Sequence, residues 1–222
     1  MIGTLEFLKE NQQLKLEGEN HSFITTIESV KPNFFTVKGD HQIIEHLSVH
    51  IGAKMKGIFI HEDSIYSFET KVVRKEIAPP RLSLSWPKEV VEDKVKCYQR
   101  AGFTGVEGYL PFRYEPVKKG QDTIEFTKQG VATWIGGDEL NMISIFEIPK
   151  GSLLALELQQ PVSPVPFRFF GKVHKIKQHG SLYHIRLLFE AIREKDRDLI
   201  LKYCLQKQAQ LNRTGLLKPS ES

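Results

Sequence analysis

The chain has 222 residues, of which 40% are hydrophobic and 26% are charged, and its formal net charge is +4. This length is enough for one large or two small domains, each with its own core. The charge suits contact with anionic surfaces or nucleotides but is too weak to indicate nucleic acid by itself. No run approaches 18 apolar residues, and the N-terminus lacks the features of a signal peptide, so we expect a cytoplasmic protein with no membrane span.

The two cysteines, Cys97 and Cys204, lie far apart and show no metal-ligand spacing. We expect both to be reduced thiols and expect no metal site. Catalytic signatures such as G-x-S-x-G, the P-loop and H-E-x-x-H do not occur. The sequence therefore predicts no enzyme, no catalytic residues and no cofactor.

Up to about residue 90 the chain consists of short segments rich in β-branched and aromatic residues, separated by polar turns. The candidate strands are residues 21–30, 34–37, 54–60, 65–73 and 82–86. Such spacing is typical of a small antiparallel barrel or sandwich. We assign residues 1–90 to an N-terminal β-barrel domain.

A boundary follows this first domain. Pro79, Pro80 and Pro87 interrupt the alternation, because proline cannot donate to a strand ladder. The charged stretch that follows predicts an interdomain linker at residues 91–104. The second domain is then expected at residues 105–222.

In the second domain the alternation returns and later changes to a helical period. The candidate strands are residues 108–114, 123–134, 152–158, 167–177 and 183–189. Between residues 192 and 213, Leu199, Ile200, Tyr203 and Cys204 fall on one helical face. This pattern predicts a C-terminal helix that packs on the domain core.

Two short motifs follow one another in this part of the chain. Residues 99–104 are Gln-Arg-Ala-Gly-Phe-Thr, and residues 125–130 are Glu-Phe-Thr-Lys-Gln-Gly. The pair resembles the two halves of the cyclic di-GMP site in PilZ domains, whose pattern is R-x-x-x-R followed by [DN]-x-S-x-x-G. The first motif keeps Arg100 but has Thr104 in place of the second arginine. The second has Glu125 for Asp or Asn, Thr127 for Ser, and the family's Gly130.

The resemblance extends over nearly the whole chain, to the flagellar-brake (YcgR-like) branch of the PilZ proteins. Residues 170–173 and 183–190 resemble its later barrel strands, and residues 194–203 resemble the start of its terminal helix. The resemblance implies a mainly β fold. We expect an N-terminal split barrel, a C-terminal six-stranded PilZ barrel and a C-terminal α-helix.

The resemblance also implies a nucleotide site, vestigial or weak, formed by Gln99, Arg100, Thr104, Glu125, Thr127 and Gly130. Arginine suits cyclic di-GMP because its planar fork meets phosphate or guanine with two hydrogen bonds. Each lost bidentate contact costs roughly 1–3 kcal/mol. Losing two weakens binding on the order of thirtyfold to more than ten-thousandfold. We therefore expect cyclic di-GMP to bind weakly or not at all, and expect Gly130 to be kept for packing.

These features suggest a non-enzymatic bacterial regulator that acts by contact with a protein partner in motility, pilus or surface-attachment control. Flagellar or pilus machinery is the candidate partner, no nucleic acid is expected, and the oligomeric state, monomer or dimer, stays open. One alternative is a functional cyclic di-GMP receptor whose atypical site borrows basic residues such as Arg113 and Lys128. Another is a nucleic-acid-binding β-barrel that uses the stretch Phe-Arg-Phe-Phe at residues 167–170.

Overall fold

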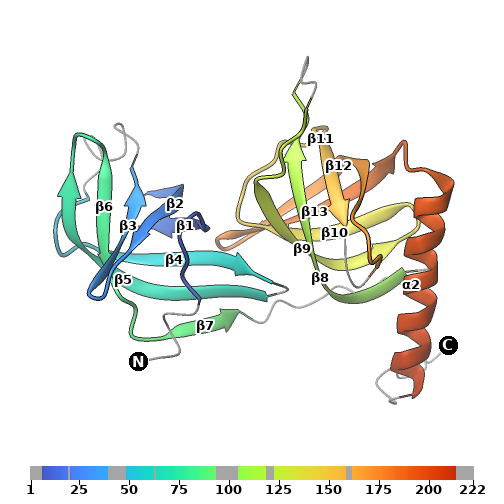
Figure 1. The fold of residues 1–222 in the computed structure, drawn as a ribbon, viewed down its shortest axis with the longest axis horizontal. Helices are drawn as coiled ribbons and strands as arrows, with labels where there is room; N and C mark the ends of the chain where they lie inside the picture. Colours follow the sequence, from blue (N-terminus) through green and yellow to red (C-terminus); the bar gives the residue numbers. More distant parts are fainter. Residues whose placement is uncertain are drawn as a thin grey trace. The chain divides into compact units, whose positions relative to one another are not determined.

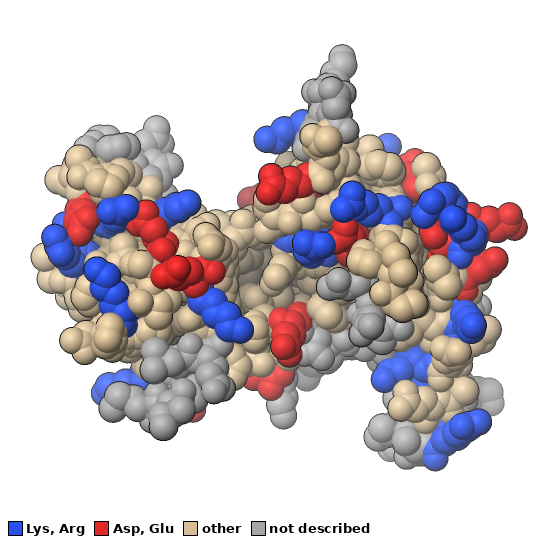
Figure 2. All heavy atoms as spheres, viewed as in Figure 1, with Lys and Arg blue, Asp and Glu red and all other residues tan. Residues whose placement is uncertain are grey.

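The computed structural model describes residues 7–19, 21–39, 49–62, 64–93, 105–118, 123–158 and 162–213. The chain divides into two compact units, Met1–Val95 and Lys96–Ser222, and each is a β-barrel (Figure 1). Lysine, arginine and carboxylate side chains are interspersed over the face drawn in Figure 2. Within the described ranges, no helix has the length and apolar character needed to cross a membrane.

Six antiparallel strands close the N-terminal barrel. They are β1 (Gln13–Glu17), β2 (Ser22–Val30), β3 (Phe34–Lys38), β4 (Lys54–His61), β5 (Ser64–Glu76) and β6 (Arg81–Ser85). The ring runs in the order β4-β1-β2-β3-β6-β5 and is closed by the pairing of β5 with β4. A seventh strand, β7 (Val90–Asp93), pairs with the first half of β5.

The core of this barrel follows from residue alternation along the strands. Leu14 and Leu16 on β1 are fully buried, as are Leu82 and Leu84 on β6. The rings of Phe35, Phe59 and Phe68 pack against one another at the centre. Because inward-facing apolar residues recur at every second position, each strand buries one face.

The C-terminal barrel contains β8 (Gly105–Pro116), β9 (Lys128–Gly136), β10 (Glu139–Ser144), β11 (Leu153–Leu158), β12 (Phe167–His179) and β13 (Leu182–Glu190). It is closed in the order β10-β13-β12-β11-β8-β9. Helix α2 (Glu194–Arg213) lies alongside β8 and β9 (Figure 1). Its Ile200 and Cys204 are fully buried in the barrel's hydrophobic cluster, so the predicted core-docking helix is confirmed.

The mainly β fold of two barrels with a C-terminal helix is also confirmed. Three strands were not predicted, namely β1, β7 and β10. The boundary between the two units, after Val95, falls within the predicted linker. The first residues of that linker belong to β7, and the rest, from residue 94, lies outside the described residues.

Candidate functional site

The first half of the second motif, residues 125–127, lies in the segment that leads into β9, and the second half lies in β9 itself. The sequence predicted a strand from residue 123, but this was wrong, because β9 begins at Lys128. Glu125 and Thr127 therefore precede the strand, and both are exposed. Outside the ladder, their polar groups are free to make contacts other than strand hydrogen bonds.

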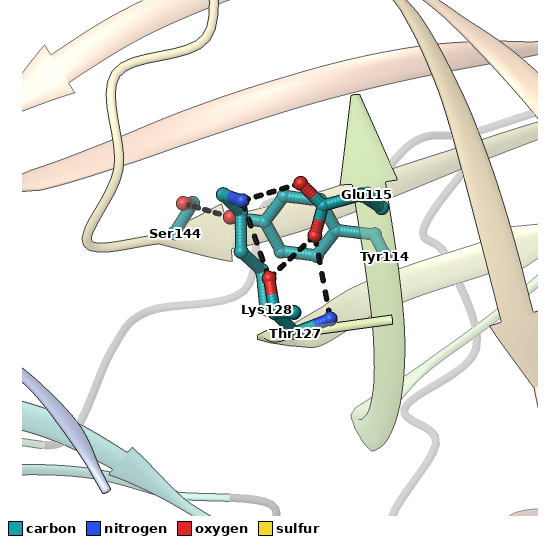
Figure 3. Close-up of polar contacts among 5 residues, drawn as sticks. All are labelled: Tyr114, Glu115, Thr127, Lys128 and Ser144. Atoms are coloured by element: carbon teal, nitrogen blue, oxygen red, sulfur yellow. Dashed lines mark hydrogen bonds and ion pairs between the residues drawn. The ribbon is translucent and has the colours of Figure 1, made fainter. Parts of the chain in front are cut away.

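Thr127 is held by a carboxylate from the neighbouring strand (Figure 3). Its hydroxyl donates to Glu115 Oε2 at 2.6 Å, and its backbone N–H donates to the same oxygen at 3.3 Å. The ammonium of Lys128 donates to Glu115 Oε1 at 2.6 Å. One carboxylate of β8 thus takes up the donors at the start of β9.

The charge on Glu115 is stabilised by these donors. Partial burial raises the pKa of this carboxyl, but the hydrogen bonds from Lys128 and Thr127 outweigh burial and hold the pKa below its usual value. At neutral pH Glu115 is therefore an anion. Its two oxygens accept from the hydroxyl and N–H of Thr127 and from the ammonium of Lys128.

The inner side of the same strand is fixed by a buried hydrogen bond. Tyr114 is fully buried, and its hydroxyl lies 2.7 Å from that of Ser144 on β10 (Figure 3). Burial raises the pKa of Tyr114 above its ordinary value, so the phenol stays neutral. Tyr114 points inward and Glu115 lies next to it in the strand, so the anchored ring also fixes the position of the carboxylate.

Gly130 is explained by packing alone. It lies opposite Phe112 in the register of β8 and β9. A Cβ at Gly130 would come within 2.7 Å of Phe112 Cζ, closer than carbon atoms can approach. The structural role predicted for this glycine is therefore supported, and the cause is the Phe112 ring.

A ladder of charged residues crosses the outside of three strands. Arg113 on β8 lies opposite Glu157 on β11, which lies opposite Arg168 on β12. Arg113 donates to Glu157 Oε1, and Arg168 Nε donates to Glu157 Oε2 at 2.8 Å. Burial raises the pKa of Glu157, but the two guanidinium donors reverse this and lower the pKa overall.

These arginines line an open groove of about 670 Å³. The guanidinium of Arg168 lies over the ring of Phe126, 4.9 Å from the ring centroid. Phe126 belongs to the second motif. Arg193, at the start of the helical segment, also lines the groove and donates to Asp196 at 2.5 Å. The groove thus combines three guanidinium groups with the carboxylate of Glu157.

The structure tests only half of the site predicted from sequence. Gln99, Arg100 and Thr104 lie outside the described residues. Thr127 lies just before β9 and Gly130 lies within it, and their neighbours are Glu115 and Phe112. Glu125 is exposed and makes no contact with another described residue.

Sequence reasoning missed Glu115 and Glu157, and it named Arg168 only within the stretch at residues 167–170. Arg113 and Lys128 had been singled out only as neighbouring positive charges. The cross-strand register could have found these partners, because it places Glu157 between two arginines. That register, of β11 with β8 and with β12, is a tertiary pairing that the sequence pattern does not fix.

The stretch proposed for nucleic-acid stacking is not suited to it. Phe167 and Phe169 are 6% and 2% exposed and belong to the barrel core. Stacking of bases requires exposed aromatic faces. Only Phe170 in this stretch has a partly exposed ring.

Comparison with known proteins gives matches among solved structures only. No family model matches the chain, and no curated protein matches it. The inhibitor of motility MotI/DgrA of Bacillus subtilis is 16% identical, with 91% of this chain and 99% of that chain covered and a TM-score of 0.40. YcgR of Escherichia coli in complex with cyclic di-GMP is 11% identical, with 93% and 89% covered and a TM-score of 0.38.

A third match is the MrkH–cyclic di-GMP complex of K. pneumonia. It is 13% identical, with 92% of this chain and 90% of that chain covered and a TM-score of 0.41. The matched YcgR and MrkH structures are complexes with cyclic di-GMP.

Proposed function

We propose that the chain is a non-enzymatic regulatory protein of the PilZ type that binds cyclic di-GMP weakly or not at all. It acts by contact with a protein partner in motility, pilus or surface-attachment control. The process and the partner class come from the motif resemblance. The hydrogen bonds of Thr127 to Glu115 support weak nucleotide binding.

One observation carries the proposal, and it is the internal carboxylate at the second motif. The hydroxyl and N–H of Thr127 and the ammonium of Lys128 all donate to Glu115. A phosphate that approached these donors would have to displace Glu115 and would meet its negative charge. Since charge-assisted hydrogen bonds are the strong ones, this displacement opposes binding.

The missing arginine adds to this effect. Thr104 offers a single hydroxyl where the family has a guanidinium fork, and Glu125 is one methylene longer than the family's Asp. The phosphates of the ligand gain nothing from the carboxylate of Glu115. The proposal therefore combines a lost contact with an internal competitor.

A second candidate function is a working receptor with an atypical site. The groove beside Phe126 favours it, because Arg113, Arg168 and Arg193 expose parts of their guanidinium groups there. Arginine can bind phosphate and stack on bases. In this candidate the groove would take over the role of the missing motif arginine.

Titration calorimetry with cyclic di-GMP tests the proposal directly. With protein at tens of micromolar, we expect no saturable heat from the intact chain. A low-micromolar isotherm would contradict the weak site and support the receptor. In that case Arg168→Ala should abolish the heat if the groove is the site, whereas Lys150→Ala, an exposed control in the same domain, should leave it unchanged.

A further inference from the structure

The longest stretch of the chain without an acidic residue runs along β12 and β13. Between Glu157 and Glu190 there are five lysines and arginines, three histidines and no aspartate or glutamate. The chain as a whole has 31 basic and 27 acidic residues. The overall composition is nearly balanced in charge, so the absence of acidic residues from this stretch is a local feature of the sequence.

The strand geometry gathers these charges on one face. Val173 and Ile176 belong to or pack against the barrel core, so they point inward. Lys172 and Lys177 therefore point outward, and the bulge between Val173 and Lys175 turns Lys175 outward as well. We call Lys172, His174, Lys175, Lys177 and His179 the β12 strip, and all five are exposed.

The partner strand adds to the charge of this surface. Lys175 lies opposite Arg186, so two cations face each other there. His184, opposite Lys177, is neutral at pH 7, because burial and then the nearby His179 and Lys177 lower its pKa. Like charges directly opposite one another destabilise an antiparallel pair. Arg186 is balanced by Glu139 on β10, with Nε 2.6 Å from Oε2.

The lysines of the strip have no such balance. Among the described residues, Lys172, Lys175 and Lys177 make no ion pair, although Arg113, Arg168 and Arg186 on the same barrel each have a carboxylate partner. Within the described ranges, three ammonium groups of one strand therefore have no carboxylate partner. The cross-strand repulsion would be relieved by an anionic surface placed over the strip.

We propose that the β12 strip is a docking surface for an acidic segment of a protein partner. The proposal rests on the proposed function, because a regulator that acts by contact needs such a surface. Lysine provides a point charge without a fork and so suits carboxylates of varied geometry. The lysines of the strip make no ion pair with a described carboxylate, so the strip is complementary in charge to clustered Asp and Glu side chains.

Other polyanions fit the strip less well. Tight nonspecific binding to duplex DNA uses about six to ten phosphate contacts, and the strip offers three lysines. A membrane-docking surface would carry exposed apolar side chains beside its cations. Among the large hydrophobic residues exposed in the described part of the chain, Leu153 lies opposite Lys172, whereas others, for example Val165 and Leu205, belong to other segments. A single leucine beside the strip is a small apolar surface for membrane docking.

The test is fluorescence anisotropy with labelled poly-L-glutamate at low ionic strength, using the full chain. The variant Lys172→Gln, Lys175→Gln, Lys177→Gln removes the charge of the strip. The matched control is Lys150→Gln, Lys195→Gln, Lys202→Gln, which makes the same charge change at exposed lysines of the same domain. We expect binding to weaken roughly tenfold or more in the strip variant and less than twofold in the control.

Equal losses in the two variants, or no loss in the strip variant, would overturn the proposal. A labelled random-sequence DNA duplex and vesicles of phosphatidylglycerol are run as parallel probes. If either probe binds more tightly than poly-L-glutamate, and if this binding is lost in the strip variant, the proposal is overturned. The ligand of the strip would then be nucleic acid or membrane and not an acidic protein segment. Circular dichroism checks that each variant is folded. If the triple variant unfolds, the single variants Lys175→Gln and Lys177→Gln are tested for binding in its place.

The result is independent of the nucleotide site. Cyclic di-GMP calorimetry on the same strip variant should match the intact chain, because the strip shares no residue with the second motif or with the groove. A positive calorimetric signal would contradict the proposed weak site and leave the anisotropy result unaffected. Failure of the anisotropy test would remove the docking surface and leave the proposed weak site standing.

Discussion

Thr127 donates both its hydroxyl and its backbone N–H to a single oxygen of Glu115, at 2.6 and 3.3 Å. Thr127, which occupies the position of the serine in the PilZ motif, is thus hydrogen-bonded to a carboxylate of the same chain. An internal carboxylate in this position imitates the charge of the expected ligand. The competition between the two can be measured.

The first prediction concerns Glu115→Gln. The change removes the negative charge and releases Lys128 from an ion pair. Weak cyclic di-GMP binding should therefore strengthen roughly tenfold to a hundredfold, as expected for one charge-assisted hydrogen bond of about 1.5–3 kcal/mol. The amide signal of Thr127 in an NMR titration to millimolar ligand reports the change. Glu147→Gln, an exposed carboxylate without a described contact, is the control. Equal dissociation constants in the intact chain and in Glu115→Gln would show that Glu115 does not compete.

The second prediction concerns Glu157, which is 2% exposed and bridges Arg113 and Arg168. Glu157→Gln should lower the free energy of unfolding by about 1–3 kcal/mol at pH 7, because the hydrogen bonds to a charged acceptor are weakened. The two guanidinium groups are partly exposed, so solvent keeps the effect moderate. Urea unfolding measures it, with the exposed Glu190→Gln as control.

The effect of Glu157 should depend on pH with a definite sign. Its folded-state pKa lies below the ordinary value of 4.5, so its stabilisation is fully present above that value. It is lost as the pH falls through the folded-state pKa, because the carboxylate is then protonated in both states. The difference between the intact chain and Glu157→Gln should therefore shrink below about pH 4.5. A difference that stays constant from pH 7 to pH 3 would contradict this account.

The third prediction is that Gly130→Ala destabilises the barrel without any ligand present. The new methyl group would overlap the buried ring of Phe112, and such overpacking costs about 1–3 kcal/mol. Gly137→Ala is the matched control, because its methyl group meets only the movable end of Leu201, at 3.0 Å. Thermal unfolding measures the loss of stability in each variant, and we expect the larger loss for Gly130→Ala.

A double variant makes this prediction sharper. Phe112→Leu removes part of the ring that the new methyl group meets, so Gly130→Ala should cost less in that background than in the intact chain. Equal costs in both backgrounds would mean that Phe112 is not the reason for the glycine. The retention of this glycine in the motif would then need another explanation.

The fold was largely predictable because its strands alternate clearly. β2 and β12 carry β-branched or aromatic residues at inward positions, which is the pattern that indicates a half-buried strand. β1 was missed although Leu14 and Leu16 alternate, because Gln, Lys, Leu and Glu favour helix locally. β10 was missed for a similar reason, since Glu139 and Asn141 are poor strand formers.

The site was less predictable, because it depends on partners from other strands. The motif residues could be found by spacing, but Glu115 lies next to a run read as an ordinary strand. Its contact with Thr127 follows from the register of β8 with β9, in which Tyr114 lies opposite Lys128. Register is a tertiary property, so a sequence pattern alone does not fix it.

The last prediction is a restoration of the nucleotide site. The variant Thr104→Arg, Glu125→Asp, Thr127→Ser returns the family residues, and Gln99→Arg adds a further guanidinium. We expect cyclic di-GMP affinity to rise by a few kcal/mol, because each arginine supplies bidentate hydrogen bonds at about 1–3 kcal/mol. Adding Glu115→Gln should strengthen binding again, since the serine introduced at position 127 would otherwise donate to the same carboxylate as Thr127 does. Calorimetry measures each step.

The control for the restoration is Thr104→Lys in place of Thr104→Arg, which adds the same charge without the planar fork. If the fork matters, the lysine version should bind several-fold more weakly; if only charge matters, the two should agree. A folded variant with all five changes that still binds no cyclic di-GMP would contradict the idea that the missing arginine and the internal carboxylate together silence the site. The outer surface of the barrel near β8 and β9 would then itself have diverged, and regulation through protein contact would no longer depend on a masked nucleotide site.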